Sequence, residues 1–140
     1  MSDPGPGQVL FAFVRHWSRR SSEAEQGRLV LVTEAVHSLT RRGIEATVNA
    51  VAHEIGIDQS GASRLIKSAA EAGYLTMRAS ASDGRRRWAT VTPAGHTMLS
   101  QAHEWQERVF DRLTETWSPR RRSDFQQAMT ELIDRSYEYL

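Results

Sequence analysis

The chain has 140 residues, of which 39% are hydrophobic and 25% charged, so its composition is that of a globular domain rather than of a disordered segment. It contains no cysteine, which excludes disulfides, thiolate metal sites and thiol redox sensing. The net charge is only +1, but residues 60–92 carry six basic and two acidic side chains, and this basic segment is a candidate surface for a polyanion.

The ends and the hydropathy of the chain predict a protein that neither crosses a membrane nor carries a secretory signal. Its longest apolar run, residues 9–14, has six residues, whereas about 18 are needed to span a bilayer. Residues 1–7 contain two prolines and two glycines but no basic patch and no apolar segment. We therefore expect a flexible tail over residues 1–7 and a cytoplasmic protein.

Apolar residues recur at helical spacing over about residues 8–20 and again over residues 29–39, where the pattern ends before Gly43. Two short helices should follow, one beginning after Thr47 as its N-cap and one between Gln59 and Gly73. A tight turn that contains glycine joins these two, which is the pattern of a helix-turn-helix.

The next segment is expected to be a β-hairpin with strands over residues 74–82 and 85–92. Asp83-Gly84 is a strong signal for a two-residue hairpin turn, in which both central residues have positive φ. Thr92-Pro93 is typical of a helix start, with threonine as the cap and proline in the first helical position. That helix should end near Trp117, and Ser118-Pro119 then repeats the same start for a last helix.

This order of elements predicts a mainly α fold with a two-stranded β wing, a winged helix-turn-helix flanked by additional helices. The second helix of such a motif enters the major groove of DNA. Its outward face combines short polar side chains with long cations, as expected for contacts to base edges and to phosphates. The candidate DNA-binding residues on this helix are Gln59, Ser60, Gly61, Ser63, Arg64 and Lys67. Gly61 keeps the start of the helix slim and would allow close approach to the duplex.

The hairpin tip carries three consecutive arginines, Arg85, Arg86 and Arg87, directly after Asp83. Arginines this close repel one another, and a phosphate backbone or a narrow minor groove relieves that repulsion. The tip is therefore a second candidate DNA contact, beside that of the recognition helix.

Several of these motifs together resemble the MarR family of regulators (multiple antibiotic resistance regulators). The motifs that carry the resemblance are Ile57-x-x-Ser60-x-x-Ser63-Arg64-Leu65-Ile66, Glu71-x-Gly73-Tyr74-Leu75, Asp83-x-Arg85 and Val91-Thr92-Pro93-Ala94-Gly95. The resemblance covers residues 29–96 and implies a sequence-specific transcriptional repressor. It also implies that Asp83 braces Arg85 by an ion pair and that Arg85 enters the minor groove.

Aromatic residues are concentrated in the flanking helices, which the winged-helix core does not need. They are Trp17, Trp105, Trp117, Phe125 and Tyr137. Packing two chains together would bury them, and a two-fold dimer is the commonest solution. We therefore expect one domain over residues 8–140, with a DNA-binding lobe at 29–95 and dimerisation helices at 8–28 and 96–140. Two recognition helices would then read a near-palindromic operator, with half-sites about one DNA turn apart.

The resemblance further implies a site for a small aromatic or phenolic effector that releases the protein from DNA. Its candidate lining residues are Phe13, His16, Trp17, His37 and Trp105. We find no catalytic constellation, no metal-ligand motif and no cofactor motif, and so expect no enzyme. Two alternatives stay open: a sequence-tolerant architectural DNA-binding protein, and a winged-helix module for protein–protein contact.

Overall fold

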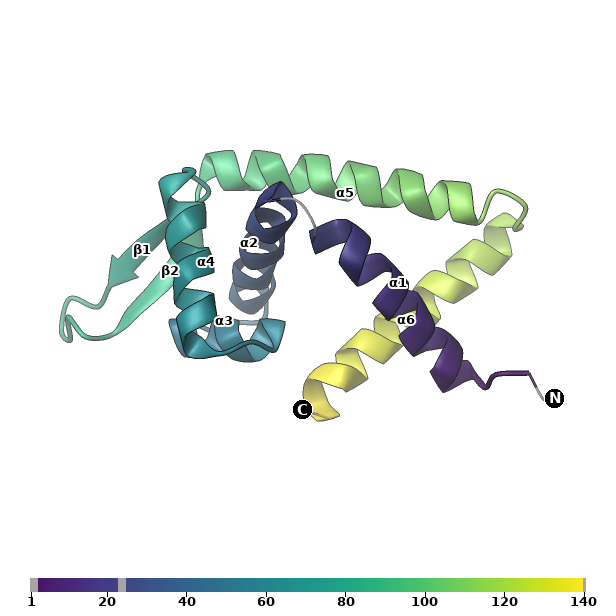
Figure 1. Ribbon diagram of the computed structural model, residues 1–140, viewed down its shortest axis with the longest axis horizontal. Helices are drawn as coiled ribbons and strands as arrows, with labels where there is room; N and C mark the ends of the chain where they lie inside the picture. Colours follow the sequence, from purple (N-terminus) through teal and green to yellow (C-terminus); the bar gives the residue numbers. More distant parts are fainter. Residues whose placement is uncertain (1–2, 23–24, 140) are drawn as a thin grey trace. The chain divides into compact units, whose positions relative to one another are not determined.

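The computed structural model describes residues 3–22 and 25–139. These residues form six helices and two strands (Figure 1). In chain order they are α1 (Pro6–Ser22), α2 (Glu25–Arg41), α3 (Val48–Ile55), α4 (Gln59–Glu71), β1 (Leu75–Ala79), β2 (Arg87–Val91), α5 (Pro93–Leu113) and α6 (Pro119–Tyr139). The expected winged helix-turn-helix with additional helices at both ends is confirmed.

The chain divides into two compact units, Met1–Ala102 and His103–Leu140, and helix α5 continues from the first into the second. The first unit holds the helix-turn-helix of α3 and α4 and the wing of β1 and β2. The second holds the end of α5 and all of α6. Among the described residues, no helix is long and apolar enough to cross a membrane.

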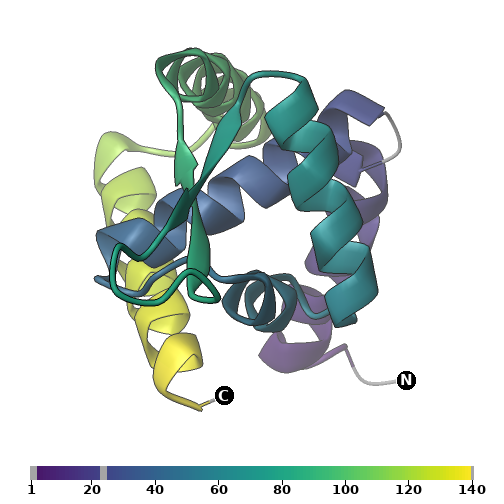
Figure 2. The ribbon, with the colours of Figure 1, turned by 90° about the vertical axis from the view of Figure 1, so that its left-hand side faces the viewer.

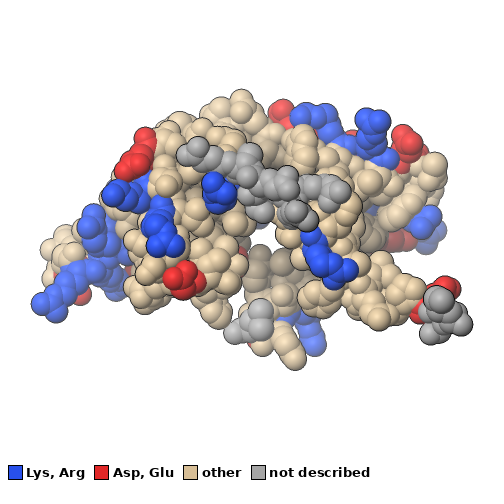
Figure 3. Space-filling model, viewed as in Figure 1, with Lys and Arg blue, Asp and Glu red and all other residues tan. Residues whose placement is uncertain are grey.

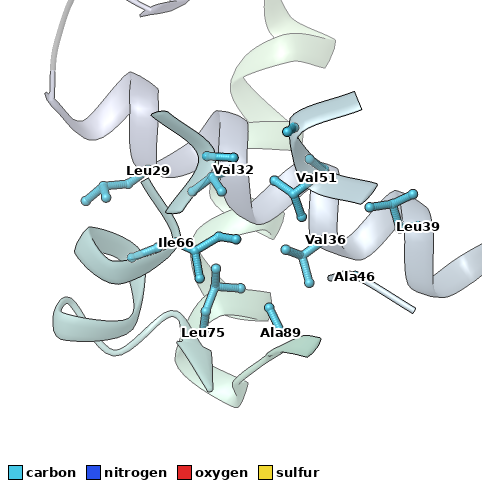
Figure 4. Packing of buried hydrophobic residues seen from close by; sticks show 13 residues of the cluster. Leu29, Val32, Val36, Leu39, Ala46, Val51, Ile66, Leu75 and Ala89 are labelled. Atoms are coloured by element: carbon cyan, nitrogen blue, oxygen red, sulfur yellow. The ribbon is translucent and has the colours of Figure 1, made fainter. Parts of the chain in front are cut away.

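The hydrophobic core of the first unit is built by α2, α3, α4 and the two strands. Figure 4 shows their apolar side chains pointing toward one another, with Val32 and Val36 from α2 facing Val51, Ile66 and Leu75. Val32, Val36 and Val51 are completely buried. Because this core closes without α1 or α6, the lobe that presents α4 and the wing is stabilised by its own packing.

Local sequence signals set the ends of the helices as expected. Thr47 caps α3 by accepting the backbone N–H of Ala50 at 3.1 Å, and Gly56 ends it with a left-handed backbone at φ 80°. Thr92 caps α5 through its hydroxyl, which accepts the N–H of Gly95 at 3.0 Å.

The first helix begins at Pro6, two residues earlier than expected, because the amide side chain of Gln8 accepts the N–H of Gly5 and fixes the first turn.

The wing differs from the expected hairpin in its turn. Its strands end at Ala79 and resume at Arg87, and they pair antiparallel with Leu75 opposite Val91 (Figure 2). Gly84 has no positive φ, so the expected two-residue turn is wrong. The Asp83 carboxylate accepts the N–H of Arg85 at 3.0 Å, and the Asp83 carbonyl accepts that of Arg86 at 3.0 Å. This side-chain turn moves the bend one residue onward, to Gly84 and Arg85.

A third extended segment joins the wing. The Ala46 carbonyl, in the link between α2 and α3, accepts the N–H of Ala89 at 2.9 Å and forms an isolated antiparallel bridge to β2. Both alanines are 1% exposed, so their small side chains let the link lie directly on the strand. The wing is therefore anchored to the helix-turn-helix.

In the second unit, α5 ends at Leu113 rather than near Trp117. The Arg122 side chain donates to the Thr114 carbonyl at 2.8 and 3.1 Å and to the Asp111 carboxylate at 3.1 Å. The Thr114 carbonyl also accepts the N–H of Trp117 at 2.9 Å, so both Arg122 and Trp117 bond a carbonyl for which the helix itself supplies no partner. The Trp117 ring packs edge-on against Phe125 at 5.4 Å, so the turn is closed by apolar contact as well.

Candidate nucleic-acid interface

The recognition helix α4 has one buried and one exposed face. Its buried residues, Ala62, Ile66 and Ala69, recur every three or four positions and pack into the core. The remaining face carries the residues predicted to meet DNA, of which the exposed ones are Gln59, Ser60, Ser63, Arg64 and Lys67. The structure thus presents these side chains together to solvent, along one side of the helix.

The N-terminus of α4 explains the glycine at position 61. Asp58 caps the helix, and its carboxylate oxygen accepts the Gly61 N–H at 3.2 Å. A Cβ at position 61 would lie 2.7 Å from that same oxygen. Gly61 is partly buried, and its small size makes room for the cap, so its position has a structural reason beside the expected close approach to a duplex.

The wing brings its three arginines to the end of the domain that also presents α4. Figure 3 shows Lys and Arg side chains gathered over the wing and α4, at the left of that view. Arg85, Arg86 and Arg87 are all exposed. Such a concentration of positive charge on one face attracts a polyanion and is weakened by salt.

The three arginines do not have the same surroundings. The Arg86 side chain forms an ion pair with Glu45, with 2.9 Å between Nε and Oε2. In the part of the chain that the structure describes, neither Arg85 nor Arg87 makes an ion pair. Asp83 bonds the backbone of Arg85 rather than its guanidinium, so the ion pair implied by the family resemblance is absent here.

Charged groups on α4 are likewise available for a partner. Within the described residues no ion pair involves Arg64 or Lys67, although Glu71 follows on the same helix. A partly exposed ion pair between Arg42 and Glu54, at 2.6 Å, joins the end of α2 to α3 instead. Within the described residues, Arg64 and Lys67 of α4 and Arg85 and Arg87 of the wing therefore carry positive charge that no ion pair balances.

The candidate effector residues are distributed over three helices. Phe13, His16 and Trp17 cluster on α1, where the Trp17 ring lies 6.3 Å from that of Phe13 and 5.8 Å from that of His16. His37 on α2 lies against the ring of His96 at 5.6 Å, a neighbour that the sequence did not indicate. Trp105 lies on α5 in the second unit and is 44% exposed.

Two further residues could not be found from sequence patterns. Glu45 lies in an irregular link, and its pairing with Arg86 joins positions 41 residues apart. His96 follows the capping motif of α5, and its ring meets that of His37 although 59 positions separate the two residues. Among the described residues, no three histidine or carboxylate side chains gather where they could hold a metal ion.

The comparisons with known proteins support the resemblance seen in the sequence. Residues 35–86, from α2 to the wing, match the model of the MarR family. A comparison with curated protein sequences gave no match. The resemblance is thus confirmed over the segment that holds the helix-turn-helix.

Solved structures share the fold over nearly the whole chain. The crystal structure of MarR aligns with a TM-score of 0.73 and 20% identity, covering 99% of this chain and 96% of MarR. A MarR family protein from Bacillus stearothermophilus aligns with a TM-score of 0.68 and 14% identity, covering 94% of this chain and 92% of that one. For Bordetella bronchiseptica BpsR the TM-score is 0.57 at 17% identity, with 89% of this chain and 98% of BpsR covered, and its structure concerns regulation of DNA binding by 6-hydroxynicotinic acid.

Proposed function

With its central segment matched to the MarR family and its fold shared with MarR, we propose that this protein is a sequence-specific DNA-binding transcriptional regulator. The observation that carries the proposal is the single face on which α4 and the wing present cations that form no ion pair with any described residue. Arg64 and Lys67 on α4 and Arg85 and Arg87 on the wing lie in a lobe with its own core. The recognition helix would enter the major groove while the wing contacts the adjacent minor groove.

Within this interface the residues divide by chemistry. Ser60, Ser63 and Arg64 lie in the first turns of α4, where short hydroxyls and a guanidinium suit base edges. Lys67 lies a turn further along and suits a phosphate. Arg85, in the bend of the wing, is placed to enter the minor groove, whose negative potential attracts arginine.

We propose that the protein acts as a homodimer. Helix α6 has no buried residue and exposes Met129, Leu132 and Ile133, which are 39%, 51% and 47% exposed and share one face of the helix. Helix α1 exposes Phe11 and Phe13 at 68% and 52%. Exposed apolar side chains on a helix are costly in water, and a second copy of the chain would cover the apolar face of α6 and the phenylalanine rings of α1 with two-fold symmetry.

The dimer can be tested by light scattering coupled to size exclusion. We expect twice the chain mass of 15.8 kDa for the wild type and a monomer for Leu132→Glu. Gln127→Glu, on the opposite face of α6, is the matched control and should leave the dimer intact. A monomeric wild type would contradict the proposal, and a dimeric Leu132→Glu variant would place the interface elsewhere.

The experiment that tests DNA recognition is selection from a library of random duplexes at about 150 mM salt, where non-specific binding is weak. The proposal expects an inverted repeat with half-sites about one DNA turn apart, roughly 34 Å. Binding without any motif would favour an architectural DNA-binding protein. No binding at low salt would favour a module for protein contact.

We propose that the protein represses transcription by occluding a promoter, and that a small aromatic compound releases it from the DNA. The DNA binding of BpsR is regulated by 6-hydroxynicotinic acid, which supports a ligand of this class. The ring cluster of Phe13, His16 and Trp17 on α1 offers apolar area beside a polar group. The test is release of the selected operator by a panel of hydroxylated aromatic acids that includes 6-hydroxynicotinic acid. Release by none of them would contradict this part of the proposal.

A further inference from the structure

The ion pair between Arg86 and Glu45 ties the wing to the link between α2 and α3. Arg86 lies one residue before β2, and its carbonyl accepts the N–H of Ser80 at 2.9 Å, which closes the base of the wing turn. Glu45 directly precedes Ala46, the residue that bridges to Ala89. The pair is thus a second attachment of the wing, beside that bridge.

The direction of the Arg86 side chain follows from these positions. Ala89 lies three residues beyond Arg86 along β2, and Glu45 is next to the residue that pairs with it. To reach Glu45 at 2.9 Å, the guanidinium must extend along the strand toward Ala89 and away from the bend at Gly84 and Arg85. The charge of Arg86 is therefore directed toward the body of the domain.

The electrostatic consequence is that the three arginines have different roles. Glu45 balances the charge of Arg86, whereas Arg85 and Arg87 have no ion pair within the described part of the chain. A phosphate gains less from a guanidinium that must first leave a carboxylate than from one that is free. The pair is 60% and 42% exposed, so it contributes mainly by orienting the wing rather than by stabilising the fold.

We propose that Arg86 is a positioning residue, which holds the wing in place through Glu45 and is not one of its phosphate ligands. Contacts with DNA then fall to Arg85 and Arg87. This assignment rests on the proposed DNA binding, because the wing needs a fixed direction only if it meets a partner.

The test is the salt dependence of affinity for one duplex, the selected operator, measured for the wild type, Arg85→Gln, Arg86→Gln, Glu45→Gln and the double variant Glu45→Gln/Arg86→Gln. Log K falls as log salt rises, and each arginine charge that no longer neutralises the duplex, whether it lies in a groove or against a phosphate, lowers the magnitude of that slope by about 0.9. We expect that loss for Arg85→Gln and an unchanged slope for Arg86→Gln, with affinity lowered up to about five-fold. Glu45→Gln should match Arg86→Gln, and the double variant should lose no more than either single one.

A second measurement needs no DNA. In the free protein, Arg86→Gln and Glu45→Gln should speed hydrogen exchange of the Ala89 amide, which bonds Ala46, whereas Arg85→Gln should not. The reversed pair, Glu45→Arg with Arg86→Glu, should restore both the exchange rate and the affinity.

The outcomes separate the two proposals. If Arg86→Gln lowers the slope as much as Arg85→Gln, and Glu45→Gln raises affinity, Arg86 is a phosphate ligand and its assignment as a positioning residue is overturned, while DNA binding stands. If the wild type binds no duplex, or Arg85→Gln leaves the slope unchanged, DNA binding by the wing fails and the assignment fails with it.

Discussion

Gly95 is closely surrounded at the start of α5, and Gly95→Ala is the substitution that probes this packing. The Thr92 N–H donates to the Tyr74 carbonyl at 3.0 Å, which holds the start of α5 on the turn between α4 and β1. A Cβ at position 95 would lie 2.8 Å from Cγ1 of Val91 and closer still to the Tyr74 carbonyl oxygen. Because that oxygen already accepts a hydrogen bond, it cannot move aside without breaking it.

The expected cost follows from these contacts. Overpacking costs about 1–3 kcal/mol, and a weakened hydrogen bond adds about 0.5–1.5 kcal/mol. The better helix propensity of alanine offsets up to about 1 kcal/mol of this. We therefore expect Gly95→Ala to lower the free energy of unfolding by about 2 kcal/mol, which corresponds to a fall in Tm of about 8 °C for a domain of this size.

The assay is urea unfolding followed by circular dichroism, at one protein concentration because a dimer unfolds in a concentration-dependent way. Gly84→Ala is the control, since a Cβ there meets nothing within 4 Å and the residue has no positive φ. Its stability should stay within about 0.5 kcal/mol of the wild type. Equal stability of Gly95→Ala and the wild type would refute the packing argument.

Three other substitutions test the recognition helix and the second unit. Arg64→Ala should weaken binding to the selected operator by about 1–3 kcal/mol and relax the sequence preference at one base pair; an unchanged affinity in a titration would remove Arg64 from the interface. Asp58→Ala should cost about 1 kcal/mol of stability in urea unfolding through loss of the α4 cap, and a neutral result would show that the cap is dispensable. Arg122→Ala should lower Tm because the ion pair with Asp111 is lost and the Thr114 carbonyl keeps only its bond from the Trp117 N–H; Arg120→Ala, at an exposed residue, is the control that should leave Tm unchanged.

The features that could be predicted from the sequence, such as helix caps and helix ends, depend on contacts between residues that are close together in the chain. Thr47 and Thr92 cap their helices as expected, because a cap needs only a hydroxyl within three residues of a free N–H. Gly43, Gly56 and Gly73 all adopt the positive φ that ends a helix. The apolar periodicity of α4 likewise separated the buried Ala62 and Ile66 from the exposed Arg64 without any knowledge of the core.

The wing shows where such local inference fails. Asp83-Gly84 is compatible with two turns, and the carboxylate of Asp83 selects the later one by bonding the Arg85 N–H. The choice also depends on the register of β1 and β2, which sets Ser80 opposite Arg86. The spacing of residues along the chain does not determine that register, because the boundary between the loop and either strand can shift by one residue or more.

The sequence by itself determined the helices, their caps, the basic segment and the identity of the residues on the outer face of α4, since each depends on contacts within a few residues. Only the tertiary structure decided which charges remain free. The pairing of Arg86 with Glu45 and the contact of His37 with His96 join residues 41 and 59 positions apart, and these exist because packing brings separate elements together. The physical reason is that periodicity and capping act along the chain, whereas charge pairing depends on distances through space.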